Sequence, residues 1–138
     1  MNERTLAIIK PDAFAQNVVG QIITMAESRG LSIIGVKLLH LTQEQAENFY
    51  HVHRGKEFFH SLTQFMSEGA IIALVFQGKD AIACWREIMG ATNPSEAKEG
   101  TARVQFGNNI ERNAVHGSDS AESAGFEISY FFNELELL

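Results

Sequence analysis

Cysteine, proline and long apolar runs are scarce in this sequence, and each scarcity narrows the possible classes of protein. Cys84 is the only cysteine, which excludes an intramolecular disulfide framework and suits a reducing compartment. With 2 prolines and 20% charged residues, the composition is that of an ordinary globular protein. We therefore expect a single domain over residues 1–138, a cytoplasmic location, and a buried, inert thiol at Cys84.

Apolar length and positive charge are also limited. The longest apolar run, residues 70–76, is far shorter than the roughly 20 residues of a membrane helix. Residues 1–4 lack the pattern of a signal peptide, so neither a membrane nor an export role is expected. The net charge of -6 argues against a broadly basic nucleic-acid-binding surface, although a few converging cations can still hold a small anion.

Hydrophobic periodicity predicts the secondary structure. The predicted strands are 5–9, 31–39, 70–76 and 114–116, and the predicted helices are 18–26, 43–50, 58–66, 80–89 and 119–131. Allowing for the extra helices, this order is the ferredoxin-like βαββαβ plan, an α+β fold with a four-stranded antiparallel sheet and helices mainly on one side. The run 70–76 has no polar alternation and should be a central strand covered on both faces.

Local signals add detail to this plan. Thr42 and Gln45 have the spacing of a capping box at the start of a helix. Asp119, with Glu122 three residues later, is predicted to cap the last helix, in which Ala121 should face inward. Residues 91–112 are the least regular part of the sequence.

The segment 113–120 is the strongest candidate for chemistry. His116 stands between a predicted strand and a capped helix, and Gly117 leaves open space beside its ring. A helix N-terminus offers free N–H groups to a phosphoryl group, and an imidazole becomes a competent nucleophile once its other nitrogen is held. Glu127 could hold that nitrogen from the last helix. On these residues alone, the alternative is a structural histidine beside a helix cap.

No standard phosphate loop accompanies this histidine. Neither a Walker A loop nor a G-x-G-x-x-G motif is present, so any kinase chemistry must use discrete side chains. Lys10, Arg86 and Arg103 are candidates, although each of them, taken singly, is better interpreted as a solvated charge or a local ion pair.

The other histidines and the paired phenylalanines carry weaker signals. His51, His53 and His60 lack the i, i+4 spacing of helical metal ligands, so no metal site is expected there. On composition alone, Phe58 and Phe59 favour a core position over a ligand platform.

Three segments, residues 9–12, 90–94 and 113–120, together resemble the nucleoside diphosphate kinase family, and the likeness runs from residue 4 to residue 132. The resemblance implies transfer of a γ-phosphate from a nucleoside triphosphate to a nucleoside diphosphate by a ping-pong mechanism through a phosphohistidine. The short chain is similar to bacterial members, which implies a homo-oligomer, either a tetramer or a hexamer.

The resemblance also implies roles for individual residues. His116 would be the nucleophile, oriented by Glu127 and Ser118, with Lys10 assisting catalysis. The implied nucleotide-binding residues are Lys10, Tyr50, Phe58, Leu62, Arg86, Thr92, Arg103, Ile110 and Asn113. Mg²⁺ would bridge the outer phosphates with little direct protein ligation.

Two departures from the family pattern stand out. Gln105 replaces an acid that commonly follows Arg103, which puts the bracing of that segment in doubt, and Trp85 stands where smaller or polar side chains are common.

Three alternative functions are weaker. An inactive scaffold or regulatory member of the same fold would not need the full set of site residues. A nucleic-acid-binding module would want aromatic residues alternating with basic ones along its strands. A small-molecule-binding regulatory domain gives no reason for His116 beside Gly117 with a distant Glu127.

Overall fold

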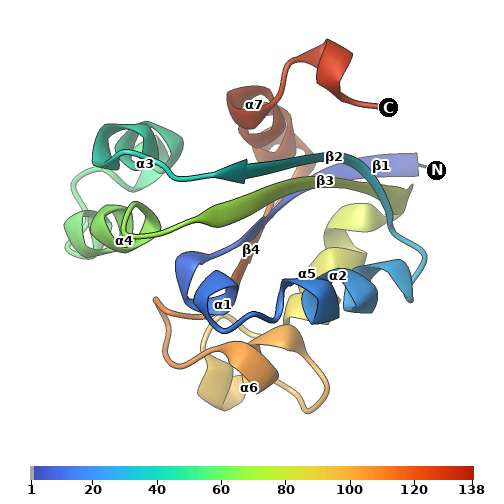
Figure 1. Cartoon of the computed structure of the whole chain (residues 1–138), viewed down its shortest axis with the longest axis horizontal. Coiled ribbons are helices and arrows are strands. Elements are labelled where there is room, and N and C mark those ends of the chain that lie inside the picture. The colour runs from blue at the N-terminus through green and yellow to red at the C-terminus, as the bar shows by residue number, and fades with distance from the viewer. Residues whose placement is uncertain (1) are drawn as a thin grey trace.

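The computed structural model describes residues 2–138 and places four strands in one antiparallel sheet. The strands are β1 (Asn2–Ile9), β2 (Ser32–Leu39), β3 (Ile71–Lys79) and β4 (Val115–Gly117), in the order β2-β3-β1-β4. Strand β1 pairs with β3 and with β4, and β2 pairs with β3, so the chain's first strand lies at the centre beside its last (Figure 1). The predicted ferredoxin-like α+β plan is confirmed.

Seven α-helices surround the sheet in the described residues. They are α1 (Pro11–Ala15), α2 (Val19–Glu27), α3 (Gln43–Phe49), α4 (Phe59–Met66), α5 (Ala81–Met89), α6 (Ala102–Phe106) and α7 (Ala121–Phe131). Short 3₁₀ turns occupy His51–His53, Pro94–Glu96 and Glu134–Glu136. The sequence did not predict α1, α6 or the 3₁₀ turns, because so few residues carry too little periodicity to be recognised.

The helices cover both faces of the sheet, so the expectation that they lie mainly on one side is wrong. Ala7 and Ile9 of β1 pack in a cluster with α2 and α5, whereas Leu6 and Ile8 pack in a second cluster with α3, α4 and α7. Figure 1 shows α7 on the opposite side of the sheet from α1, α2 and α5. The residues of β3 from 71 to 76 are buried throughout, as predicted for a central strand.

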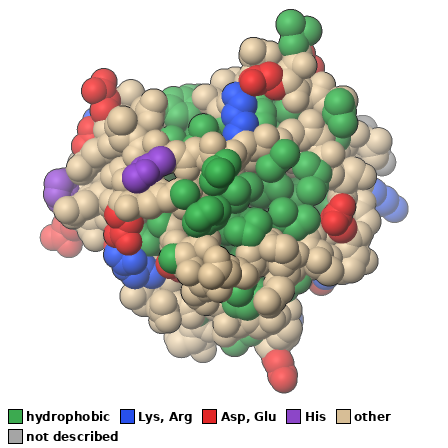
Figure 2. Space-filling view, viewed as in Figure 1, with side chains coloured by type: hydrophobic (Ala, Val, Ile, Leu, Met, Phe, Trp, Pro, Cys, Tyr) green, Lys and Arg blue, Asp and Glu red, His purple; other side chains and the backbone are tan. Residues whose placement is uncertain are grey.

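The edge strand β2 is less completely covered. Val36 and Leu38 are 57% and 65% exposed, and Figure 2 shows apolar side chains gathered on this face of the molecule. Lys37 of β2 binds the C-terminal part of the chain. Its Nζ donates to the Phe131 carbonyl at 2.8 Å and to Glu136 at 2.9 Å, which fixes the C-terminal turn to β2.

Helix ends are set by side-chain caps. The predicted capping box of Thr42 and Gln45 is confirmed. The last helix is capped by Ser120, whose oxygen accepts from the Ser123 N–H at 3.1 Å, so the predicted cap at Asp119 is wrong. The extended backbone of Ser120 puts its short hydroxyl within reach of that N–H, and the helix starts one residue later than expected, which leaves Ala121 exposed.

The connection before β4 holds an unusual backbone geometry. Ala114 has φ of 75°, a left-handed conformation that costs free energy for a residue with a Cβ. The Ala114 N–H donates to the Asp12 carboxylate at 3.0 Å, and the Ala114 carbonyl accepts from the Lys10 N–H at 2.8 Å. The strained residue is therefore fixed against the end of β1, two residues before His116.

Two further sequence expectations concern the surface. Cys84 is partly exposed, so the prediction of a buried thiol is only half right. Among residues 2–138, no helix combines the length and apolar character needed to cross a membrane.

Candidate active site

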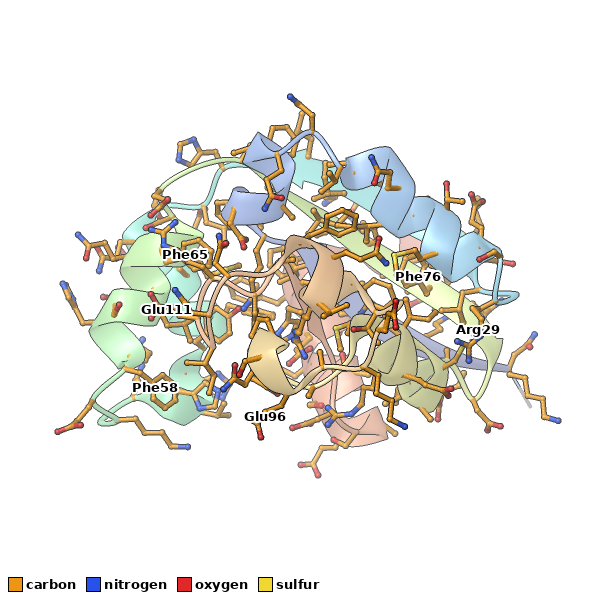
Figure 3. The ribbon with its side chains drawn as sticks, turned by 90° about the horizontal axis from the view of Figure 1, so that it is seen from below. Arg29, Phe58, Phe65, Phe76, Glu96 and Glu111 are labelled. Carbon is orange, nitrogen blue, oxygen red and sulfur yellow. The ribbon has the colours of Figure 1, made fainter. Side chains whose placement is uncertain are left out.

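One pocket of about 860 Å³ collects side chains from both ends of the chain. The predicted site residues that line it are Lys10, Tyr50, Phe58, Leu62, Arg86, Thr92, Arg103, Ile110, Asn113 and His116. Figure 3 shows Phe58 and Glu111 on the α4 side of this region and Glu96 on the separate Pro94–Glu96 turn. Of the remaining two predicted residues, Glu127 contacts His116 and Ser118 contacts Glu127, as described next.

His116 is held by a chain of hydrogen bonds. Its Nε2 lies 3.0 Å from Oε1 of Glu127, and the Ser118 hydroxyl donates to the same oxygen at 2.8 Å. The Leu6 N–H donates to Ser118 Oγ at 3.2 Å, which anchors the chain to β1. Because an ionised carboxylate only accepts, Nε2 carries the ring hydrogen, and Nδ1 of the neutral imidazole keeps its lone pair.

The fold explains why these groups meet. Strand β4 ends at Gly117 and α7 begins at Ala121, so the helix returns past the strand and brings Glu127, almost two turns in, back to His116. Two aromatic rings restrict the imidazole further. The rings of Phe49 and Tyr50 meet it edge-on at centroid distances of 5.4 and 6.0 Å.

Among the cationic side chains that line the pocket, Arg103 lies near both Lys10 and Arg86. Lys10 is buried, its Nζ donates to Asn113 Oδ1 at 2.8 Å, and burial together with the nearby charge of Arg103 lowers its pKa to about 8. Burial and the neighbouring Arg86 lower the pKa of Arg103 to about 10. Burying like charges close together costs free energy, and such an arrangement is typical of a site that binds an anion.

Arg103 is positioned by backbone carbonyls. Its Nη1 donates to Gly90 O at 3.0 Å, and its Nη2 donates to Val115 O at 2.9 Å. Gln105 donates to Gly100 O at 3.2 Å and so ties its own helix to the preceding loop. The missing acid at position 105 therefore does not leave Arg103 without support.

Several buried polar atoms in the pocket have no hydrogen-bond partner within the described part of the chain. They are Tyr50 Oη, Arg103 Nε and His53 Nδ1. Each such group costs roughly 1–3 kcal/mol, so their grouping in one pocket indicates a polar ligand. Burial, and then the charge of Glu127, raises the pKa of Tyr50, which keeps its hydroxyl neutral and able to donate.

The outer part of the pocket is apolar and open. Phe58 and Ile110 are 46% and 64% exposed, and Leu62 is buried behind them. Phe59 instead packs against the core cluster that contains Leu6 and Ile8 of β1. Of the adjacent pair, Phe58 thus lines the open pocket and Phe59 packs against the core, a division that composition could not show.

Sequence reasoning overlooked some pocket residues. His53 was considered only as a metal ligand, yet it stacks on Tyr50 at 6.2 Å and meets Phe58 at 5.2 Å. Burial and the nearby Lys56 lower the pKa of His53. Glu111 lines the pocket with its carboxylate accepting from the Ser61 hydroxyl at 2.9 Å. No local pattern marks either residue, because the 3₁₀ turn and the loop that carry them meet only in the folded chain.

Nearly the whole chain matches known proteins of one family. The family model for nucleoside diphosphate kinase matches residues 3–137. Nucleoside diphosphate kinases of Oleidesulfovibrio alaskensis and Geotalea uraniireducens are 55% and 53% identical to this chain, with 99% of each chain covered in both cases.

Solved structures are similarly close. The nucleoside diphosphate kinase of Aquifex aeolicus has a TM-score of 0.97 and 42% identity and covers 100% of both chains. The enzyme of Halobacterium salinarum, solved in complex with CDP, has a TM-score of 0.96 and 36% identity, and the match covers 100% of this chain and 92% of that one. The sequence, the fold and the arrangement around His116 lead to one conclusion: this chain belongs to the nucleoside diphosphate kinase family.

Proposed function

We propose that this enzyme, which transfers phosphate between nucleotides, does so through a phosphohistidine at His116, and that residues 1–138 form its single domain. One observation carries the proposal. Glu127 holds Nε2 of His116 at 3.0 Å, so Nδ1 is the ring nitrogen with a lone pair to donate.

The reaction follows from that arrangement. The Nδ1 lone pair attacks the γ-phosphorus of a nucleoside triphosphate, the bond from phosphorus to the bridging oxygen breaks, and the nucleoside diphosphate leaves with the electron pair. As positive charge develops on the ring, Glu127 stabilises it through the Nε2–H. A second nucleoside diphosphate then attacks the phosphorus in the reverse sense, and His116 is released.

The phosphate-binding roles follow from the charges. Lys10, Arg86 and Arg103 would neutralise the polyphosphate, and the neutral hydroxyls of Tyr50 and Thr92 would donate to it. The partnerless Tyr50 Oη and Arg103 Nε supply buried polar groups that a phosphate can satisfy.

The sugar and the base would occupy the rest of the pocket. Asn113, which already bonds Lys10, would contact the sugar hydroxyls. Phe58, Leu62 and Ile110 would clamp the base by stacking and apolar contact. The CDP complex of the similar Halobacterium salinarum enzyme supports nucleoside diphosphates as ligands.

Membership of the family implies that the reaction needs a divalent metal ion, and we propose Mg²⁺. Residues 2–138 contain no group of three or more His, Cys, Asp or Glu side chains that could coordinate a metal ion. The metal therefore fits only if the nucleotide phosphates are its main ligands. When bound there, it would neutralise charge on the outer phosphates.

We also propose a symmetric homo-oligomer, a tetramer or a hexamer, in the cytoplasm. The exposed Val36 and Leu38 on β2 support association, because apolar side chains gathered on one face favour covering by a partner. The single Cys84 supports a reducing compartment.

Incubation with γ-labelled ATP tests the nucleophile. The wild-type protein should gain an acid-labile label and pass it to added nucleoside diphosphate, whereas His116→Ala should gain no label and show no turnover. The stability change should stay below the ~2–5 kcal/mol of a core truncation, because the ring serves chemistry more than packing.

A matched control removes another histidine. His60→Ala, at an exposed position, should label like the wild type. A folded His116→Ala protein that turns over at near the wild-type rate would show that another residue is the nucleophile. A wild-type protein that binds nucleotide but takes no label would instead support the inactive alternative.

A further inference from the structure

Both peptide groups that flank the Cα of His116 accept a side-chain hydrogen bond. Arg103 Nη2 donates to the Val115 carbonyl at 2.9 Å, and the indole Nε1 of Trp85 donates to the His116 carbonyl at 3.1 Å. Arg103 already has a role at the phosphates. Trp85 has none in the proposed reaction, and it is fully buried.

The indole is packed tightly against the strand that carries the nucleophile. A Cβ built at Gly117 would lie 2.5 Å from Trp85 Cδ1 and 2.8 Å from its Nε1. Only a glycine therefore allows the ring to approach close enough to bond the neighbouring carbonyl. The indole also meets the Phe76 ring of β3 edge-on, with the ring centroids 5.0 Å apart, so its orientation is restricted from β3 as well as from β4.

Strand β4 needs this support. It has only three residues, Val115–Gly117, and within the described sheet it pairs with β1 alone. A short strand at a sheet edge is intrinsically free to shift. A buried indole with fixed orientation limits that movement at the residue that must be placed for attack.

Two successive residues of helix α5 support the strand of the nucleophile and line the pocket. Trp85 points into the core against β4, and Arg86, the next residue, lines the pocket. One helical turn thus fixes a phosphate-binding cation relative to the backbone of the nucleophile.

We propose that Trp85 is a positioning residue: its indole N–H fixes the 116–117 peptide and thereby holds the His116 ring between Glu127 and the phosphate to be transferred. The inference rests on the proposed role of His116. Positioning of reacting atoms is worth large factors in rate, and a displacement of about 1 Å can cost about 10²-fold. Loss of the indole N–H should therefore lower the rate of transfer without weakening nucleotide binding.

Trp85→Phe tests this directly, because it keeps an aromatic ring beside Phe76 and removes the donor. The expected result is a fall of about tenfold in kcat and in the single-turnover rate of His116 phosphorylation, with KM changed by less than about twofold. Ile22→Val is the matched control. It truncates a fully buried residue of the same core cluster, away from the site, and should lower the melting temperature while leaving kcat unchanged.

A measurement on the wild-type protein covers the case in which Trp85→Phe does not fold. Trp85 is the only tryptophan, so its emission should change when His116 is phosphorylated by ATP without acceptor, and should not change in His116→Ala. Unaltered emission, or a folded Trp85→Phe protein with wild-type kcat, would overturn the inference. Turnover by His116→Ala would instead overturn the proposed function beneath it.

Discussion

The two halves of the pocket differ in how completely their hydrogen bonds are satisfied. In the half around His116, the ring, Glu127, Ser118 and the Leu6 N–H form a closed chain with distances of 2.8–3.2 Å. In the half that would receive the nucleotide, Tyr50 Oη and Arg103 Nε are buried and have no hydrogen-bond partner among residues 2–138. The first half is organised before substrate arrives, whereas the second awaits a ligand to complete it.

This difference has a physical rationale. The proposed nucleophile must be held in one orientation during the displacement, and preorganised groups cost no reorganisation at that moment. A binding surface gains affinity by the opposite arrangement, because a ligand that satisfies buried polar atoms removes a penalty already present in the free protein. Mutations in the first half should therefore act mainly on kcat, and changes in the second mainly on KM.

Glu127→Gln should produce the largest effect of the three changes that probe this comparison. The amide cannot stabilise a developing imidazolium as a carboxylate does, and it can present an N–H that disfavours the required tautomer. We expect kcat to fall by roughly 10²-fold or more while KM stays within a few-fold.

Steady-state kinetics with one nucleotide pair measure both constants for Glu127→Gln. Glu122→Gln, an exposed substitution on the same helix, is the control and should behave like the wild type. A Glu127→Gln enzyme that lost affinity but kept kcat would erase the proposed division between the two halves.

The pH dependence of nucleotide binding should show an intermediate effect. The pKa of Lys10 is lowered to about 8, so the free enzyme loses this cation as the pH rises through 8. Bound phosphate favours the charged form, so kcat/KM should be highest below pH 8 and should fall by up to about tenfold per pH unit above it. Arg103, with a pKa of about 10, stays charged through pH 9.

Kinetics from pH 7 to 9 check this assignment. Lys10→Met should bind nucleotide poorly already at pH 7 and should lack the fall near pH 8. If the variant kept the same inflection, another group would be responsible. Tyr50 is not that group, because burial moves its pKa upward, away from this range.

Base selectivity should show the smallest effect. Stacking on Phe58 and apolar contact with Ile110 act on the face that every base possesses, so ATP, GTP, CTP and UTP should all serve as donors. Purines should lead pyrimidines only modestly, because the larger ring stacks over more area, and the purine and pyrimidine efficiencies should stay within roughly one to two factors of ten, about 1.4–2.8 kcal/mol. A preference for one base beyond a thousandfold would show that the pocket reads base edges.

Glu111 is the polar residue best placed to create such a preference. Its carboxylate accepts from the Ser61 hydroxyl, and its side chain lies beside the apolar clamp. Because Ser61 already engages it, Glu111→Ala should change the ratio of GTP to UTP efficiency by less than about threefold, which kcat/KM for each donor would measure. A larger loss confined to GTP would identify Glu111 as a reader of amino groups.

The sequence predicted those parts of the molecule that depend on local order. The long strands, the helices with strong periodicity and the cap at Thr42 follow from side-chain spacing, which acts over a few residues. The same kind of signal placed His116 between a strand and a helix and put Glu127 on that helix. Short elements such as α1 and α6, and the choice of Ser120 over Asp119 as the cap, were missed because neighbouring residues offer nearly equal alternatives.

The tertiary structure alone decided the properties that depend on distant neighbours. The Lys10–Asn113 bond joins residues 103 positions apart, and the bond from Trp85 to His116 joins residues 31 apart. The lowered pKa of Lys10 comes from burial and from Arg103, neither of which a local pattern records. Secondary structure depends on neighbours along the chain, whereas desolvation and long-range hydrogen bonding depend on which residues the folded chain brings together. Composition and spacing therefore identified the chemical groups, and only the fold determined their protonation and their positions.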